Sequence, residues 1–342
     1  MATIKLLSIR DSALTHLPPL CWHGSPGRRR TVPTALLVVA ATVLATGLVG
    51  PGQTSAEAAN PRVSGIELEF GESERNSLAV KTATAVCPAG KRVLGGGSSI
   101  GSSSGYGADA VTLTRLKPYM DGTTGRFGYA ARAAETYSGT TGDWSVNAWA
   151  ICANPVPGLH IVVEETASLS LAKQATAALC PSGKRALGSG AEILFDLSQF
   201  QQGVGLQVAR ASGSGDIARA QAHEAPSGYP HNWRVAAYAI CATTPPGYEV
   251  RYGGSDTEGS EDVKVATVDC PEYWDYTIPG VPRKFRKQTV GMGGAVTDSA
   301  PGNATLSGIH PWFYDLVRLR AVENTPTNLS WDGIAVQAIC VY

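Results

Sequence analysis

Short segments in which apolar and polar residues alternate make up most of the chain after residue 58. Segments 111–116 and 128–134 alternate in this way, and segment 80–87 is rich in Val, Thr and Ala. This pattern is typical of strands that bury one face. Segment 144–152 is apolar on both faces, which predicts a central strand covered on both sides. No segment shows a sustained helical period, so the sequence predicts an all-β protein.

Two sequence blocks occur three times in this part of the chain. The first is C-P-S-G-K-R-A-L-G-S-G at Cys180, which recurs as C-P-A-G-K-R-V-L-G-G-G at Cys87 and, interrupted, at Cys270. The second runs from a Trp to a Cys, at 144–152, 233–241 and 331–340. The sequence therefore predicts three homologous β-modules: module 1 (59–157), module 2 (158–246) and module 3 (247–342). The linkers between them are short, so we expect the modules to pack together.

Two architectures fit a triplicated Gly-rich module. The antiparallel β-modules either pack around a pseudo-threefold axis in a β-prism-like arrangement, or form three small β-sandwiches in tandem. With 39 glycines, 43% hydrophobic and 16% charged residues, the chain is expected to be ordered. A G-x-G sequence begins at Gly95, Gly188 and Gly291. It lacks the third glycine, the helix and the acidic residue of a dinucleotide site, and so predicts a bulge or a close backbone crossing.

Each module carries one early and one late cysteine. Spacing alone allows other connectivities, but the repeat symmetry selects the disulfides Cys87–Cys152, Cys180–Cys241 and Cys270–Cys340. Each closed loop is expected to stabilise the fold by about 4 kcal/mol. Reduced core cysteines or a zinc site are weaker alternatives, because each module offers only two thiols, at no metal-ligand spacing. No metal or cofactor is predicted.

Residues 1–58 have the organisation of a signal peptide. Three arginines, 28–30, precede an apolar run over 35–49, and small residues lead to a cleavage site after Ala58. The apolar run is shorter than the roughly 20 residues of a membrane span, so a retained anchor is the weaker interpretation. Both the general and the twin-arginine export routes stay open. Cys21 is lost with the leader, and an oxidising extracellular compartment would pair the other six cysteines.

The charge balance argues against two classes of partner. The chain has 28 basic and 28 acidic residues, and the leader holds five of the former and two of the latter, so the mature part carries a net charge of minus three. Nucleic acids and anionic membranes are bound through a basic field. We therefore expect no nucleic-acid partner, and no membrane association after cleavage.

Residues suited to catalysis are sparse in the mature chain. Its four histidines, His160, His223, His231 and His310, do not occupy equivalent positions in the modules. His223 and His231 flank one hairpin and are interpreted as solvated loop residues. The chain has no G-x-S-x-G, H-E-x-x-H or S-x-x-K motif. It is therefore predicted not to be an enzyme.

One carboxylate recurs in every module, eight or nine residues before the Trp that begins the second repeated block. These pairs are Glu135 and Trp144, Glu224 and Trp233, and Glu323 and Trp331. The glutamates are secondary candidates for binding sugar hydroxyls or Ca²⁺. The alternative is structural, with each carboxylate accepting backbone N–H groups at a strand end. The tryptophans are expected to pack in the core against the disulfides rather than to stack on sugars.

Module 3 departs from the repeat by an insertion over residues 272–286. It combines aromatic and basic side chains, and the candidate ligand-binding residues are Tyr273, Trp274, Tyr276, Arg283, Lys284, Phe285 and Arg286. Aromatic faces with cationic groups stack on sugars or bind carboxylate and phosphate. A hairpin that only covers the end of the module is the alternative, although loops longer than about 12 residues are usually functional or disordered.

The C-P-x-G-K-x-x-x-G-x-G and A-Y-A-I-C motifs resemble those of uncharacterised secreted actinobacterial proteins, along the whole mature chain. This resemblance brings no activity with it. The triplicated module also resembles, more distantly, the vitelline membrane outer layer protein I type of β-prism, whose repeats are shorter and whose cysteines differ. That resemblance implies three sheets around a common axis.

These observations predict a secreted, disulfide-stabilised binding protein that recognises an extracellular glycan or a cell-surface partner. A non-catalytic structural or matrix protein of the cell surface is the alternative, and a glycan-acting hydrolase is a more distant one. Binding is favoured because variation is concentrated in a loop on a repeated scaffold.

The export prediction is testable on secreted protein. We expect a mature chain that starts near Ala59 and contains no free thiol, because the leader is removed and six cysteines are paired. Intact-mass spectrometry and thiol titration of the native protein measure both. A mass that retains residues 35–49, or a titratable thiol, would contradict the prediction.

Overall fold

The computed structural model describes residues 62–102, 105–106, 110–137, 139–197, 202–255, 262–275, 283–297, 302–312, 315–324, 331 and 333–342. The expected signal peptide, 1–58, lies outside these residues. All regular secondary structure in the described ranges is β-strand, which confirms the predicted fold class. None of these ranges contains a helix that could cross a membrane.

The described strands follow the same order in each module. Module 1 contains β1 (Glu67–Glu72), β2 (Val80–Val86), β3 (Arg92–Ser102), β4 (Gly105–Tyr106), β5 (Val111–Met120), β6 (Phe127–Glu135) and β7 (Trp144–Ala153). Module 2 contains β8 (His160–Glu165), β9 (Lys173–Leu179), β10 (Lys184–Phe195), β11 (Val204–Ala211), β12 (Ile217–Glu224) and β13 (Trp233–Thr243). Module 3 contains β14 (Glu249–Ser255), β15 (Val263–Asp269), β16 (Glu272–Asp275), β17 (Arg283–Arg286), β18 (Gln288–Val296), β19 (Ala304–Pro311), β20 (Leu316–Glu323) and β21 (Ile334–Val341).

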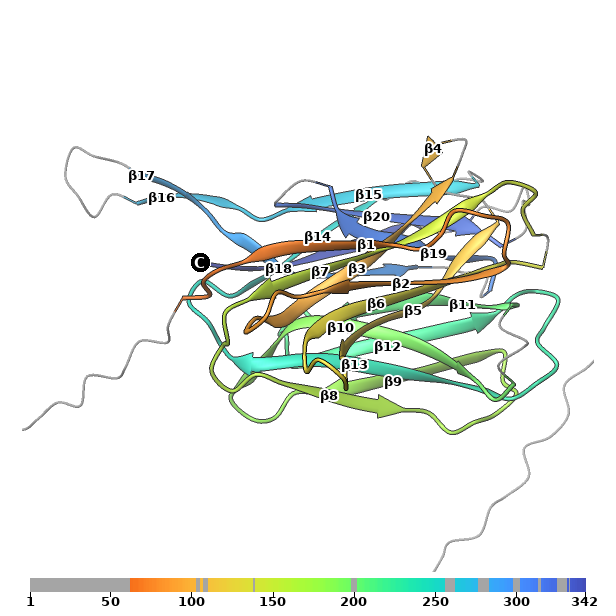
Figure 1. The fold of residues 1–342 in the computed structure, drawn as a ribbon, viewed down its shortest axis with the longest axis horizontal. Helices are drawn as coiled ribbons and strands as arrows, with labels where there is room; N and C mark the ends of the chain where they lie inside the picture. The colour runs from red at the N-terminus through yellow and green to blue at the C-terminus, as the bar shows by residue number, and fades with distance from the viewer. Residues whose placement is uncertain are drawn as a thin grey trace, which may run out of the picture. The chain divides into compact units, whose positions relative to one another are not determined.

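Three large antiparallel sheets are each shared between two modules (Figure 1). Sheet A has the order β1-β7-β3-β19-β20-β15, sheet B the order β2-β6-β5-β10-β13-β8, and sheet C the order β14-β21-β18-β11-β12-β9. When β4 and the β16–β17 hairpin are left out, each module has six strands, and in every sheet the first, last and third strands of one module join the fourth, fifth and second strands of another. The tandem-sandwich alternative is therefore wrong, because no large sheet belongs to a single module.

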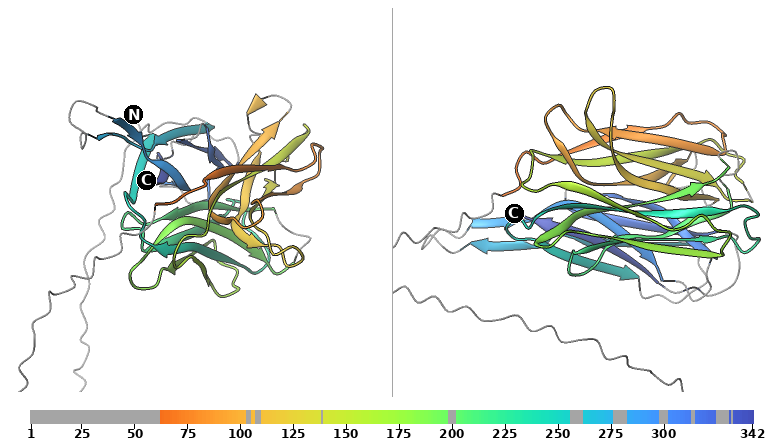
Figure 2. Two further views of the ribbon diagram at one scale, coloured as in Figure 1. Left: turned by 60° about the vertical axis from the view of Figure 1, so that its left-hand side comes forward. Right: turned by 90° about the horizontal axis from the view of Figure 1, so that it is seen from below.

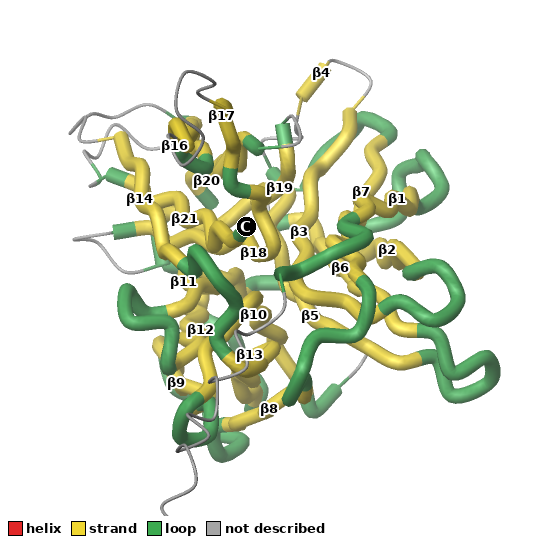
Figure 3. Tube along the Cα trace, turned by 90° about the vertical axis from the view of Figure 1, so that its left-hand side faces the viewer, coloured by secondary structure: helices red, strands yellow, loops and turns green. Residues whose placement is uncertain are grey.

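The cyclic sharing of sheets gives the three modules a pseudo-threefold arrangement (Figures 2 and 3). Each module sends three strands to one sheet and three to the next, and its two half-sheets face each other across a local core. The central strands β3, β10 and β18 of the three modules contact one another. β7 lies between β1 and β3, which confirms the central strand predicted over 144–152.

The first glycine of each G-x-G lies where these central strands meet. Register shifts occur at Gly95, Gly188 and Gly291, as the predicted bulges require. A Cβ atom at these positions would lie 2.4, 2.2 and 2.1 Å from the carbonyl oxygens of Val290, Leu94 and Leu187, respectively. Real Cβ atoms do not approach backbone so closely, so only glycine permits this contact. Both predictions for the motif, a bulge and a close crossing, are confirmed.

The second glycine of the motif permits pairing between modules. A Cβ on Gly97 would lie 1.9 Å from the carbonyl oxygen of Ile309 in β19, and one on Gly190 would lie 2.5 Å from that of Leu116 in β5. These are the strands that β3 and β10 pair with across the module boundaries. The two glycines of the motif therefore permit both the close contact of the three central strands at the pseudo-threefold axis and the pairing of strands from different modules.

The three disulfides join different pairs of sheets. Their pairing, Cys87–Cys152, Cys180–Cys241 and Cys270–Cys340, is the predicted one, with sequence separations of 65, 61 and 70 residues. In each module the first cysteine follows the second strand and the other lies in the last strand, so the bonds connect sheets B and A, C and B, and A and C. Three such bonds fit an oxidising extracellular environment.

The conserved tryptophans are core residues, as predicted, but they do not pack against the disulfides. Trp144, Trp233 and Trp331 are at most 1% exposed. Trp144 begins β7, whereas Cys152 is near its end. At about 3.3 Å per residue, eight residues of strand separate the two by roughly 26 Å. The tryptophans therefore fill the opposite end of each module from the disulfide.

The close contact of the three central strands at the pseudo-threefold axis predicts that one added methyl group there lowers stability strongly. Gly188→Ala should lower the free energy of unfolding by about 3 kcal/mol, because its Cβ would overlap backbone that has little room to move. Gly122→Ala is the matched control, since a Cβ there would meet nothing within 4 Å. Thermal denaturation of both variants measures the difference, and equal melting temperatures would contradict the proposed role of the axis glycines.

Candidate binding groove

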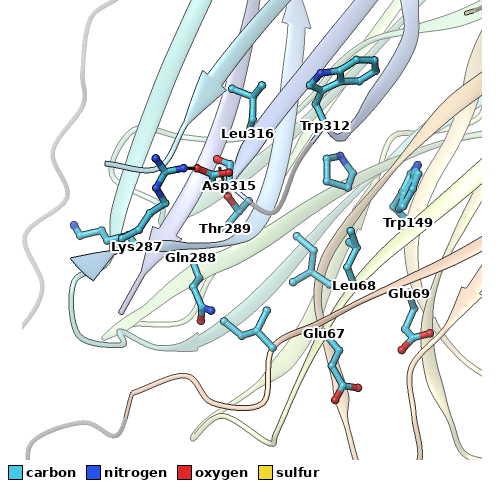
Figure 4. A pocket seen from close by; sticks show the side chains of 14 residues that line it. Glu67, Leu68, Glu69, Trp149, Lys287, Gln288, Thr289, Trp312, Asp315 and Leu316 are labelled. Carbon is cyan, nitrogen blue, oxygen red and sulfur yellow. Dashed lines mark hydrogen bonds and ion pairs between the residues drawn. The ribbon is translucent and has the colours of Figure 1, made fainter. Parts of the chain in front are cut away.

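A groove of about 720 Å³ lies between modules 1 and 3, on the face of sheet A that carries Leu68 and Trp149 (Figure 4). Its first wall consists of the beginning of β1, with Leu68, and the end of β7, with Trp149. Its second wall is formed where β19 ends and β20 begins, with Trp312 and Leu316. The start of β18 and the base of the insertion close one end.

Strand register explains why the first wall is apolar. Leu68 lies directly opposite Ile151, and Phe70 lies directly opposite Trp149, so these four side chains share one face of sheet A. The centroids of the Phe70 and Trp149 rings are 4.7 Å apart. This face was predicted to be covered, but the side chains of Trp149 and Phe70 are only partly buried or exposed.

The second wall presents another tryptophan. The guanidinium of Arg318 lies over the ring of Trp312, 4.4 Å from its centroid, and His310 makes an edge contact at 5.9 Å. These neighbours hold the indole at the rim, where it lines the groove. Burial lowers the pKa of His310, so this ring is neutral near neutral pH.

The basic end of the groove is compensated by carboxylates. Lys287 donates a hydrogen bond of 2.6 Å to Glu249. Arg286 donates to Glu272 at 2.9 Å and forms an ion pair with Asp315. Partial burial raises the pKa of Glu249, but the hydrogen bonds from Lys287 and the Tyr273 hydroxyl outweigh it, and the net pKa is lowered. Glu249 is therefore ionised.

The predicted insertion forms a hairpin beside this groove. β16 and β17 pair with Glu272 opposite Arg286 and Tyr273 opposite Phe285. Among the predicted ligand-binding residues, Arg286 lines the groove, while Arg283, Lys284, Tyr273 and Phe285 are exposed on the hairpin. Tyr276 and the side chain of Trp274 lie outside what the structure describes.

The recurring glutamates lie away from the groove, at the tryptophan ends of the modules. Glu135 is 7% exposed and accepts a hydrogen bond of 3.0 Å from Nε1 of Trp144. Glu224 accepts one of 2.9 Å from Trp233 and another of 3.1 Å from the backbone of Tyr229. Glu323 is 2% exposed. The carboxylates of Glu135 and Glu224 thus bind core indoles.

Buried polar side chains complete these clusters, and sequence reasoning missed them. The ammonium groups of Lys81 and Lys264 lie 4.5 and 4.4 Å from the ring centroids of Trp144 and Trp331. Burial lowers the pKa of Lys81, and nearby carboxylates oppose this shift. In module 2 the equivalent side chain is Gln174, which donates to the backbone oxygen of Trp233.

His223 is not the solvated loop residue expected from the sequence. It belongs to β12, is 2% exposed, and lies 3.2 Å from the amide nitrogen of Gln221. Burial, with a smaller contribution from Lys173, lowers its pKa to about 4. Its ring is therefore neutral at physiological pH and is packed in the core.

Pseudo-symmetry provides two counterparts of the groove, and both are more filled. On sheet B the equivalent cavity has a volume of about 330 Å³, and Arg92 covers the ring of Phe127 there at 4.3 Å. On sheet C the residue equivalent to Ile66 is Tyr248, whose hydroxyl donates to the carbonyl of Ala186 at 3.0 Å. The strand order is thus repeated at all three places, and side chains leave the sheet A groove open.

The described residues of β1, β7 and β18–β20 therefore form the main candidate binding site. A scan against models of protein families finds no match, and a search of curated proteins finds none either. The assignment of the site therefore rests on its geometry.

The glutamate–tryptophan contact predicts a structural effect. Glu135→Ala should lower the free energy of unfolding by about 2 kcal/mol, because it leaves the buried indole N–H of Trp144 without its acceptor. Glu165→Ala is the control, since it breaks an exposed ion pair with Arg234 and should cost about 0.5 kcal/mol or less. Chemical denaturation of both variants checks this. A stable Glu135→Ala protein with impaired ligand binding would instead favour a binding role.

Proposed function

We propose that this protein is an extracellular, non-catalytic glycan-binding protein and that the sheet A groove is its binding site. The observation that carries the proposal is the pair of tryptophans, Trp149 and Trp312, that line the groove from two different modules. The C–H faces of sugar rings pack well on indole rings, which provide large rigid apolar surfaces with a polar edge.

The polar groups of the groove suit sugar hydroxyls. Gln288 and Thr289 line it together with the tryptophans (Figure 4). Amide and hydroxyl groups provide both donors and acceptors, as a sugar hydroxyl requires. A mainly apolar cleft with a few polar groups is the usual form of a small-molecule site.

The carboxylates of the groove support binding rather than glycoside hydrolysis. A hydrolase requires one carboxylic acid that stays protonated and one that is ionised. Glu67 forms an ion pair of 2.6 Å with Lys91, and Asp315 pairs with Arg286. Both carboxylates are thus held by cations of the protein, and Glu67 and Glu69 lie on the face of β1 opposite Leu68. The groove therefore does not place two free carboxyl groups on either side of a bound sugar, as hydrolysis requires.

A glycan array followed by calorimetry on the best ligand tests the proposal. Trp312→Ala should weaken binding about tenfold or more, because it removes one of the two indole surfaces that line the groove. Tyr119→Ala, at the equivalent position of module 1, should leave the affinity unchanged.

A second set of variants distinguishes the contribution of the groove to binding from that of the inserted hairpin. The combined Trp274→Ala and Arg286→Ala change tests whether the insertion contributes to the same site, and thermal denaturation of each variant serves as the folding control. If the wild-type protein binds no glycan on the array and assembles with itself, a structural role would be favoured. Turnover of any glycan would contradict the non-catalytic assignment.

A further inference from the structure

We infer that the groove selects uncharged glycans over sulfated or uronate-bearing ones, an inference that rests on the proposed function. Basic residues beside aromatic rings ordinarily recognise anionic groups. The two cations that line this groove, Arg286 and Lys287, are instead bound by carboxylates of the protein itself.

Lys287 is part of the module framework. Its side chain is 7% exposed, and its ammonium lies between Glu249 and the rings of Tyr273 and Tyr342, 4.9 and 5.2 Å from their centroids. The equivalent lysine of module 1, Lys91, makes the same contact with Glu67 at 2.6 Å, although module 1 has no insertion. The Lys287 contact therefore belongs to the repeat and not to ligand recognition.

Arg286 is held between two carboxylates. It donates to Glu272 on the neighbouring strand. It also pairs with Asp315 at the start of β20 (Figure 4). Lys284 also pairs with Glu272. Hydrogen bonds from Lys284 and Arg286 lower the pKa of Glu272, so this carboxylate stays ionised and keeps both cations compensated.

An anionic group would compete with carboxylates of the protein itself. To bind Arg286 it would have to displace Glu272 or Asp315, which already hold the guanidinium. An uncharged sugar does not carry this cost, and like-charge contacts are an effective basis for discrimination.

The test compares matched glycans that differ only in charge. Wild-type protein is titrated at low and at physiological salt with a neutral oligosaccharide that it binds, and with the sulfated and uronate forms of the same backbone. We expect the neutral form to bind at least about fivefold more tightly, with a preference that shrinks as salt rises.

A gain of function gives an independent readout. Glu272→Gln leaves Lys284 and Arg286 with less compensation, and should raise affinity for the sulfated form by about fivefold at low salt while changing neutral binding by about twofold or less. Glu249→Gln provides a second variant acting on Lys287. Glu165→Gln, which makes the same charge change in an ion pair outside the groove, should alter neither affinity.

The outcomes separate the inference from the proposed function. Tighter binding of sulfated or uronate glycans by the wild-type protein would overturn the inference and leave the proposed function intact. Unchanged sulfate binding by folded Glu272→Gln and Glu249→Gln proteins would also overturn it. Absence of binding to any glycan, neutral or charged, would overturn the proposed function itself.

Discussion

The contact between three glycines at the module boundaries is the constraint on which the rest of the structure depends. Gly95, Gly188 and Gly291 bring three central strands together at backbone distance. At this separation no side chain fits between the strands, so the apolar residues must be buried elsewhere, between the two half-sheets of each module. The disulfides then fasten these half-sheets together at one end, and the buried tryptophans fill the other.

The close contact of the central strands also explains how a pseudo-symmetric scaffold carries one groove that differs from its two counterparts. Because each large sheet is shared between two modules, the repeat produces three equivalent places, here called valleys: the sheet A groove, the sheet B cavity and their counterpart beside Tyr248 on sheet C. The backbone fixes their position, but side chains determine their volume. Tyr248 fills one valley and Phe127 narrows another, whereas smaller or polar residues, Ile66 and Asp315, occupy the equivalent positions at the sheet A groove. A few side-chain differences are therefore enough to open one valley without disturbing the axis.

Local sequence patterns were sufficient for much of this architecture. The repeat predicted the three disulfides, the G-x-G motif predicted the close backbone contact, and alternation predicted the strands. The sharing of sheets was not predictable in the same way. β3 pairs with β19 across about 200 residues of chain, and no local sequence pattern indicates which distant strand will pair with β3. The division of each module between two sheets follows from such distant pairings.

The sheet A groove was missed for a related reason. Trp149 was interpreted as a buried residue because both faces of its strand are apolar, and only the fold reveals that one face lines a valley. Trp312 lies outside both repeated blocks, so the comparison of modules did not draw attention to it. One signal was available: the residues equivalent to Trp149 are Tyr238 and Gln337, and such variation at an otherwise repeated position is typical of a site rather than of a core.

The position of the insertion completes the argument. In modules 1 and 2 the turn after the early cysteine is closed by a hydrogen bond from Lys91 or Lys184 to the carbonyl of the proline, at 3.1 and 3.0 Å. In module 3 the amide of Lys287 makes the same bond to Pro271 at 3.1 Å, so the hairpin is inserted inside a turn whose closing contact is kept. The strand that follows can then reach the axis undisturbed. An insertion of this kind alters the rim of one valley while the shared framework stays the same. Its Arg286–Glu272 pair and the Lys287–Glu249 pair of the framework together leave that rim without an uncompensated cation among the groove-lining residues that the structure describes.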